Sequence, residues 1–169
     1  APPDHVFHLD GLLLNAEGDA DRSMQALRNA FERAGTYRFA MDWGRVAWQA
    51  GQLGEALVAY AAAANTYEGA REPWPHLNQG RILARTERWP EARAAFERSI
   101  EVFEAQDAGE PGLPSPAYAE AFFRIGETYE AEGDLARAET SFKAARSIDP
   151  NYLPVIRALD RLTQARTEP

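Results

Sequence analysis

The residues best suited to bind a metal ion stand near the start of the chain. His5 and His8 are three positions apart and are flanked by Asp4 and Asp10. On a helix, residues at this spacing share a face, and imidazole and carboxylate groups are both metal ligands. A metal site needs a third fixed ligand, which this segment does not supply. We therefore predict that these histidines are exposed or line a binding surface, and that the chain has no metal site.

Motifs that would carry catalysis are absent from the sequence. No glycine loop precedes a Lys-Ser/Thr pair, and neither Gly-x-Ser-x-Gly nor His-Glu-x-x-His occurs. The chain has no cysteine, which excludes disulfides, thiolate metal sites and a cysteine nucleophile. Its carboxylates are numerous, but they resemble solvated helix faces rather than paired acids in a pocket. We predict that the protein is not an enzyme, has no catalytic residues and needs no cofactor.

Composition and charge narrow the classes of partner. The residues are 45% hydrophobic and 26% charged, as expected of a folded protein, and no apolar run is long enough to span a membrane. The formal net charge of -8 argues against broad affinity for nucleic acid or anionic membranes. A first residue of Ala1 fits removal of an initiator or a signal peptide, or trimming. We expect a soluble protein of undetermined compartment; the cytoplasm is favoured, and the periplasm or secretion would follow if a signal peptide was removed.

Small and aromatic residues recur at shared offsets, which indicates an internal repeat. The reference positions are Gly11, Gly44, Gly80 and Gly126. Twelve positions after each comes Ser23, Ala56, Ala92 or Ala138; sixteen after comes Leu27, Tyr60, Phe96 or Phe142; nineteen after comes Ala30, Ala63, Ser99 or Ala145. Seven after, three of the four copies have glycine (Gly18, Gly51 and Gly133), and the third copy has Glu87. Close antiparallel helices need this pattern, with a small residue where the backbones meet and a glycine in the turn.

This phase predicts an all-α protein of about nine helices. Asp134 is a suitable N-cap, Pro116 follows Ser115 as an N1 proline, and Pro90 opens another helix. The predicted helices span 4–16, 21–34, 37–50, 54–67, 74–86, 90–106, 116–132, 135–148 and 151–165. The last is amphipathic and suited to covering the exposed end of a stack.

The pattern resembles the tetratricopeptide repeat, a family of 34-residue helix-turn-helix units. The final copy matches best, with Gly126, Tyr129, Gly133, Phe142 and the closing Pro150. The resemblance implies a right-handed superhelix of antiparallel helix pairs in one domain, 4–165. Its repeats would span 4–36, 37–70, 73–106 and 116–150, followed by a capping helix at 151–165, with a loop insertion at 105–116.

The resemblance also implies a binding surface, because in this family the first helix of each repeat lines a concave face. Projecting the family's inward positions gives, among others, Arg38, Met41, Arg45, Trp48, Trp74, Leu77, Arg81, Arg85 and Phe123. Asn78 and Arg124 lie one position off these rows and reach the same space, so they complete the predicted contact set. Guanidinium groups pair bidentately with carboxylates, and aromatics anchor apolar side chains at interfaces. The competing interpretation is that the arginines are solvated or paired with Glu127 and Glu130, and that the tryptophans pack between repeats.

One subgroup of the family grips C-terminal tails through a carboxylate clamp. At the corresponding positions this chain agrees only at Asn78 and Arg124, so that clamp is not expected, although another anionic peptide fits. We predict a noncatalytic module that binds a protein or peptide in the groove, with an acidic segment or C-terminal carboxylate as the anionic part of the ligand.

Two alternatives stay open from the sequence. Small acidic tetratricopeptide chaperones of bacterial secretion systems have a comparable length and hold unstructured clients. Self-assembly into a homo-oligomer is the other alternative, with the apolar run Gly11 to Leu14 as a contact.

Overall fold

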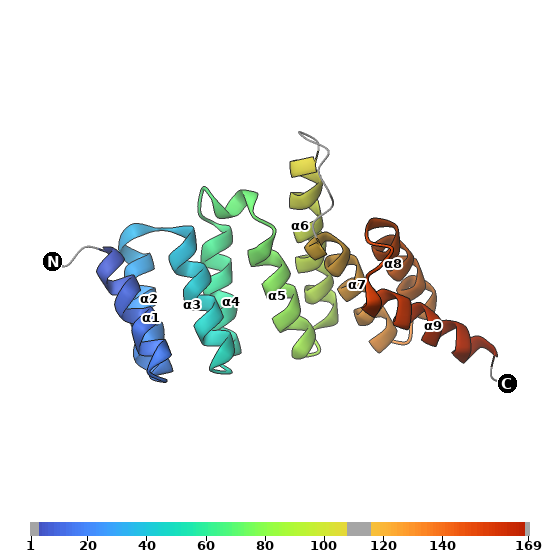
Figure 1. Cartoon of the computed structure of the whole chain (residues 1–169), viewed down its shortest axis with the longest axis horizontal. Coiled ribbons are helices and arrows are strands. Elements are labelled where there is room, and N and C mark those ends of the chain that lie inside the picture. Colours follow the sequence, from blue (N-terminus) through green and yellow to red (C-terminus); the bar gives the residue numbers. More distant parts are fainter. Residues whose placement is uncertain (1–3, 108–115, 168–169) are drawn as a thin grey trace. The chain divides into compact units, whose positions relative to one another are not determined.

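A computed structural model describes residues 4–107 and 116–167, and it divides the chain into two compact units, 1–79 and 80–169. Unit 1 contains α1 (Asp4–Ala16), α2 (Ala20–Ala34), α3 (Tyr37–Gln49), α4 (Leu53–Ala64), the short 3₁₀ helix η1 (Gly69–Arg71) and the first half of α5 (Trp74–Arg85). Within this unit α1 packs along α2, and α3 packs along α4 and α2 (Figure 1). The unit therefore consists of successive helical hairpins, as predicted.

Unit 2 begins at Gly80 and is built in the same way. It contains the rest of α5, then α6 (Trp89–Asp107), α7 (Pro116–Ala131), α8 (Leu135–Ile148) and α9 (Leu153–Thr167). Helix α7 pairs with α8, and α9 packs on α8. Phe123, Phe142, Val155 and Leu159 form a buried cluster among these three helices. The amphipathic final helix therefore buries its apolar face within unit 2, as the sequence indicated.

The four reference glycines lie where the paired helices touch. A methyl group added at Gly44 would come within 2.7 Å of the Tyr60 ring, and one at Gly11 within 2.6 Å of Leu27. At Gly80 and Gly126 it would overlap the rings of Phe96 and Phe142, which lie sixteen positions further on. The four partner side chains are fully or almost fully buried. Each hairpin thus closes only because its first helix lacks a side chain at this position.

The hairpin turns use left-handed backbone at the position seven after each reference glycine. Gly18, Gly51 and Gly133 have φ angles of 87°, 75° and 82°. Glu87, the exception in the sequence pattern, adopts the same conformation with φ 57°. The turn geometry is therefore retained in the third hairpin, although a glutamate there carries a steric cost that glycine avoids.

Three predicted helix boundaries shift by more than one residue in the structure, one of them being the end of the final helix at Thr167 rather than at 165. The fourth helix ends at Ala64 rather than at 67, and η1 follows it. Thr66 explains the early stop, because its hydroxyl donates to the Ala63 carbonyl at 2.8 Å and accepts from the Gly69 amide at 2.9 Å. The final helix begins at Leu153 instead of 151, since the Asp149 carboxylate accepts from the Asn151 amide in a turn.

The predicted loop insertion falls mainly outside the described residues. Helix α6 extends to Asp107 and α7 begins at Pro116, while 108–115 lie outside the part of the chain that the structure describes. No helix among the described residues is long and apolar enough to cross a membrane. The predicted single domain and its repeat bounds stay predictions.

We expect Gly126→Ala to lower the free energy of unfolding by about 1–3 kcal/mol, because the new methyl group meets the buried Phe142 ring. Gly54→Ala is the matched control, since no atom lies within 4 Å of that position and helical alanine is favoured over glycine. Urea denaturation followed by circular dichroism measures both. Equal stability of the two variants would contradict the packing role assigned to Gly126.

Candidate functional site

A small pocket in unit 1 brings together several members of the predicted contact set. Its lining residues come from α3, α4 and the start of α5, and it has a volume of about 330 Å³: Met41, Asp42, Arg45, Trp48, Tyr60 and Asn78. The Trp48 ring packs edge-on against Tyr60, with ring centroids 6.4 Å apart. Met41 and these two rings form apolar walls, and the remaining three residues supply polar groups. We refer to this site as the unit 1 pocket.

Asp42 organises the charges beside the unit 1 pocket. Its Oδ1 lies 3.1 Å from Nη2 of Arg45, and its Oδ2 lies 2.8 Å from Nε2 of His8 and 3.9 Å from Nε of Arg38. The Arg45 side chain is 43% exposed and that of Arg38 is 76% exposed. One carboxylate therefore serves two arginines, so this edge of the pocket keeps an excess of positive charge that solvent can reach.

His8 does not share a metal site with His5. Its side chain is buried, donates to Asp42, and stacks on Phe39 with ring centroids 4.3 Å apart. His5 is exposed on the same helix. Among the described residues, no group of three or more His, Cys, Asp or Glu side chains is arranged to hold a metal ion. His8 instead ties α1 to α3 beside the unit 1 pocket.

The remaining unit 1 members of the contact set differ in how far a ligand can reach them. Trp74, at the start of α5, is 40% exposed, whereas Leu77 is fully buried in the core. Asn78 is half-buried and lines the pocket. Leu77 is therefore a core residue that a ligand does not reach. The projection from the family pattern gives the helix face of a residue but not how deeply its side chain lies.

In unit 2, the arginines of the contact set are held by acidic residues of α7. Glu120 receives two contacts from Arg81, from Nε at 3.0 Å and from Nη2 at 2.5 Å, and a third from Nε of Arg124 at 3.2 Å. Nη1 of Arg124 donates to Glu127 at 2.8 Å. We call these four residues the Glu120 cluster. Its two positive and two negative charges balance.

The electrostatics of the Glu120 cluster favour the charged forms. Burial opposes ionisation of Glu120, but the hydrogen bond and charge of Arg81, followed by those of Arg124, outweigh it and lower the pKa of Glu120. Burial also disfavours the charged Arg124, yet Glu127 and Glu120 together raise the pKa of that guanidinium. The charged forms of Glu120 and Arg124 are therefore both stabilised by their partners.

Phe123 and Arg85 complete the unit 2 part of the contact set. Phe123 is only 7% exposed and packs against Phe142 and Tyr152, each with a centroid distance of 5.6 Å. Arg85 is exposed near the end of α5, and within the described chain its guanidinium pairs with no carboxylate. Phe123 therefore belongs to the core, whereas Arg85 is an exposed cation.

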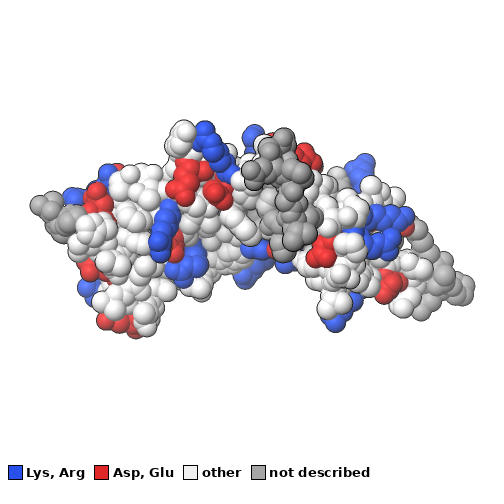
Figure 2. Space-filling view, turned by 45° about the horizontal axis from the view of Figure 1, so that its top comes forward, with Lys and Arg blue, Asp and Glu red and all other residues white. Residues whose placement is uncertain are grey.

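The predicted contact set was expected to form a basic and aromatic groove. Most of its arginines are instead paired with carboxylates of their own unit. Figure 2 shows Arg and Lys side chains lying beside Asp and Glu rather than forming one continuous basic surface. Arg124 pairs with Glu127, as the competing interpretation held, but Glu130 pairs with Arg161. Arg81 pairs with Glu120, Arg38 and Arg45 pair with Asp42, and Arg85 stays exposed. Asp42 lies one position away from the predicted inward-facing residues of α3, and Glu120 is among the predicted inward-facing residues of α7. Both carboxylates could therefore have been found in the sequence as acids on the same helix faces as the predicted arginines.

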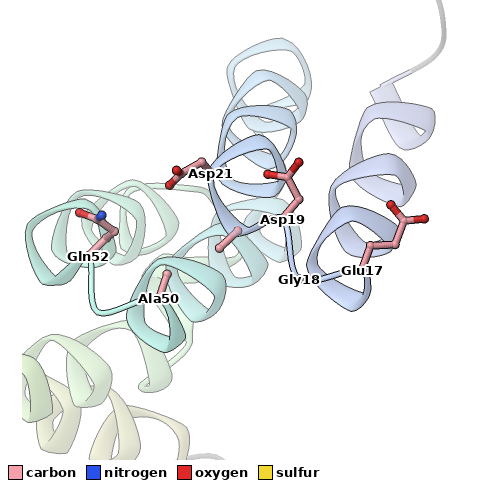
Figure 3. Close-up of a pocket in the computed structure, with 7 residues that line it drawn as sticks. Glu17, Gly18, Asp19, Asp21, Ala50 and Gln52 are labelled. Atoms are coloured by element: carbon pink, nitrogen blue, oxygen red, sulfur yellow. The ribbon is translucent and has the colours of Figure 1, made fainter.

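A second recess in unit 1 lies at the turns rather than beside the contact set. It has a volume of about 550 Å³ and is lined by Glu17, Gly18, Asp19, Ala20, Asp21, Ala50 and Gln52. Figure 3 shows its three carboxylates pointing in different directions rather than toward a common centre. Asp19 is already used as the N-cap of α2, where it accepts from the Arg22 amide. We assign this recess no ligand.

These features define the class of protein: an all-α scaffold of stacked helical hairpins with a shallow side-chain pocket and ion-paired arginines. Residues 72–151 match the family model described as tetratricopeptide repeat. The match confirms the family resemblance drawn from the last two sequence copies. A comparison with curated proteins gives no match.

Solved structures share the fold at low sequence identity. The MamA protein superposes with a TM-score of 0.77 and 14% identity, covering 97% of this chain and 82% of that one. A tetratricopeptide repeat protein from Parabacteroides merdae has a TM-score of 0.74 and 15% identity over 97% of this chain and 60% of its own. The first TPR of Spaghetti (RPAP3), solved bound to the HSP90 peptide SRMEEVD, has a TM-score of 0.64 and 16% identity over 78% of this chain and 94% of its own. The all-α, tetratricopeptide-like fold class is thereby confirmed.

We expect Glu120→Gln to destabilise the protein by about 1 kcal/mol at neutral pH, because Arg81 and Arg124 lose a charged partner. The lowered pKa of Glu120 means that its contribution is present above the ordinary carboxyl pKa and is lost as the pH falls through the folded value. The difference between wild type and variant in urea denaturation should therefore be largest near pH 7 and shrink below about pH 4. A difference that stays constant over this range would contradict the assignment.

Proposed function

We propose that this protein is a noncatalytic interaction module that binds an extended segment of a partner protein. An apolar side chain of the segment enters the unit 1 pocket, and a neighbouring acidic residue pairs with Arg38 and Arg45. This proposal rests on the unit 1 pocket, whose apolar walls are formed by Met41, Trp48 and Tyr60. These walls adjoin two arginines that share one carboxylate.

The dimensions of the pocket favour a side chain over a metabolite. Its volume of about 330 Å³ lies at the small end of ligand sites, which span about 300–1,000 Å³. Tryptophan, tyrosine and arginine are the residue types that dominate binding energy at protein interfaces. An anchor residue with an adjacent carboxylate therefore matches both the walls and the charge of this site.

The comparisons support the class of function. Tetratricopeptide repeats are in general noncatalytic interaction modules, and the TPR of Spaghetti (RPAP3) was solved with a peptide that contains several carboxylates. For this chain we infer a protein or peptide ligand with an acidic segment, and no role for nucleic acid. In unit 1, the contact set proposed for that ligand comprises Arg38, Met41, Arg45, Trp48, Trp74 and Asn78. In unit 2, the exposed Arg85 is proposed as a separate contact.

Charge reversal at the unit 1 pocket tests this proposal. The natural partner is first identified by affinity capture on the immobilised wild-type chain and mass spectrometry. Arg45→Glu should then reduce its capture at least about tenfold, because a ligand carboxylate would be repelled at a partly desolvated site.

Arg98→Glu is the matched control, since it changes the net charge equally at an exposed position of α6. It should leave capture unchanged, and both variants should retain wild-type helicity by circular dichroism. Undiminished capture by Arg45→Glu would remove the unit 1 pocket from the binding surface.

Self-assembly is a second candidate, favoured by exposed leucines on α1. Leu9 and Leu13 lie four positions apart on one face of this helix, and each is 59% exposed. A second copy of the chain would bury them. The secretion-chaperone alternative stays a prediction, because no described feature bears on it.

Sedimentation velocity over a range of concentrations tests self-assembly. If α1 forms the contact, wild type should show a concentration-dependent oligomer, and Leu9→Asp with Leu13→Asp should give only monomer because a charge is not tolerated in an apolar interface. A wild-type protein that is monomeric throughout would exclude this candidate.

A further inference from the structure

We infer that Glu120 is an intramolecular competitor for acidic ligands at Arg81 and Arg124 of unit 2. This inference rests on the proposed function in taking an acidic segment as the ligand. The Glu120 carboxylate occupies the place that a ligand carboxylate would take, since Arg81 holds it through both Nε and Nη2 and Arg124 adds Nε. Guanidinium groups recognise a bound carboxylate by this same two-point geometry.

The ion pair between Arg81 and Glu120 joins two helices and does not serve to balance charges within one helix. Arg81 and Glu120 are 39 positions apart and lie on different helices, α5 and α7. Arg124 has a second acid on its own helix, Glu127, at a spacing of three. Withdrawal of Glu120 would therefore leave Arg124 paired with Glu127 and would remove the carboxylate that accepts from Nε and Nη2 of Arg81.

Ligand exchange at this cluster is sterically open. The side chains of Arg81 and Arg124 are 28% and 38% exposed, whereas that of Glu120 is 16% exposed. An incoming carboxylate thus reaches the guanidinium groups from the solvent side, where Arg85, exposed four positions after Arg81, supplies an initial contact. Replacing one carboxylate by another keeps the charge balance of the cluster unchanged.

The arginines of the two units differ in charge balance, and this difference indicates how Glu120 would affect the choice of acidic ligand. There, Arg38 and Arg45 share the single carboxylate of Asp42 and retain surplus positive charge. In unit 2, Glu120 and Glu127 balance Arg81 and Arg124. Glu120 therefore disfavours ligands with one carboxylate at this position and favours those with several, which also engage Arg85.

Fluorescence anisotropy with labelled hexaglutamate at low salt tests the inference, with hexaglutamine as the uncharged probe. Glu120→Gln should bind hexaglutamate about fivefold more tightly than wild type, because one competing ion pair is removed. Glu101→Gln, an equal charge change at an exposed site on α6, should alter the affinity less than about twofold. The double variant Glu120→Gln with Arg81→Gln should lose the gain, and hexaglutamine should respond to none of these changes.

Glu120→Asp provides a variant of unchanged net charge, in which the shorter side chain no longer spans both arginines; a smaller gain in hexaglutamate affinity is expected. Circular dichroism verifies that each variant is folded. A purely structural role for Glu120 would lower stability without tightening binding. The inference is overturned if neither Glu120→Gln nor Glu120→Asp binds hexaglutamate more tightly than Glu101→Gln.

The two proposals fail separately. If Arg45→Glu abolishes capture of the natural partner while the Glu120 variants gain no affinity for hexaglutamate, the interaction module stands and the competitor role falls. If the Glu120 variants gain affinity while Arg45→Glu captures the partner normally, the arginines of unit 2 compete as inferred and the unit 1 pocket is not the anchor.

Discussion

The close approach of two helices at a glycine is the constraint on which each hairpin depends. In all four hairpins a glycine of the first helix faces a large buried side chain of the second, and any Cβ there would collide with it. Leu27, Tyr60, Phe96 and Phe142 are fully or almost fully buried as a result. Since protein interiors are packed to the density of organic crystals, a collision of this size cannot be absorbed by free space. The paired helices therefore have one permitted spacing, which fixes the rows of side chains on their outward surfaces.

That spacing also determines what kind of site this protein can offer. Short helices held side by side leave shallow depressions between their side chains, and the unit 1 pocket of about 330 Å³ is one of them. Deep enclosed cavities, in which paired acids acquire strongly altered pKa values, are not a product of this packing within either described unit. In the binding mode that we propose, recognition depends on a few anchors, such as Trp48, and on charges at the rim of the pocket.

Ion pairs add a second level of organisation. Asp42 draws His8, Arg38 and Arg45 together in unit 1, and Glu120 does the same for Arg81 and Arg124 in unit 2. Partly exposed pairs of this kind contribute little to stability. Under the proposed function, their larger effect is on recognition, because an arginine already paired with an internal carboxylate must exchange that partner before it binds a ligand. The two units thus present arginines of unequal availability despite similar sequence patterns.

Helix existence, pairing and turn positions could be read from the sequence, because they follow from local rules: small residues at a fixed phase, capping by Asp134, and glycines that tolerate positive φ. Glu87 replaces the glycine found at this turn position in the other three repeats, yet it adopts the same left-handed conformation. The face of each helix was likewise predictable from its period. The early end of α4 was missed, because it depends on one hydroxyl of Thr66 rather than on any periodic pattern.

Only the tertiary structure decided the depth and partners of the site residues. From the sequence, Leu77, Phe123, Arg81 and Arg85 were all predicted to contact a ligand. In the fold, Leu77 and Phe123 are buried, Arg81 pairs with Glu120, and Arg85 is exposed. The physical reason is that helical period is a property of one segment. Burial and ion pairing arise between segments, as with Arg81 and Glu120, which lie 39 positions apart and meet only when α5 and α7 are folded together.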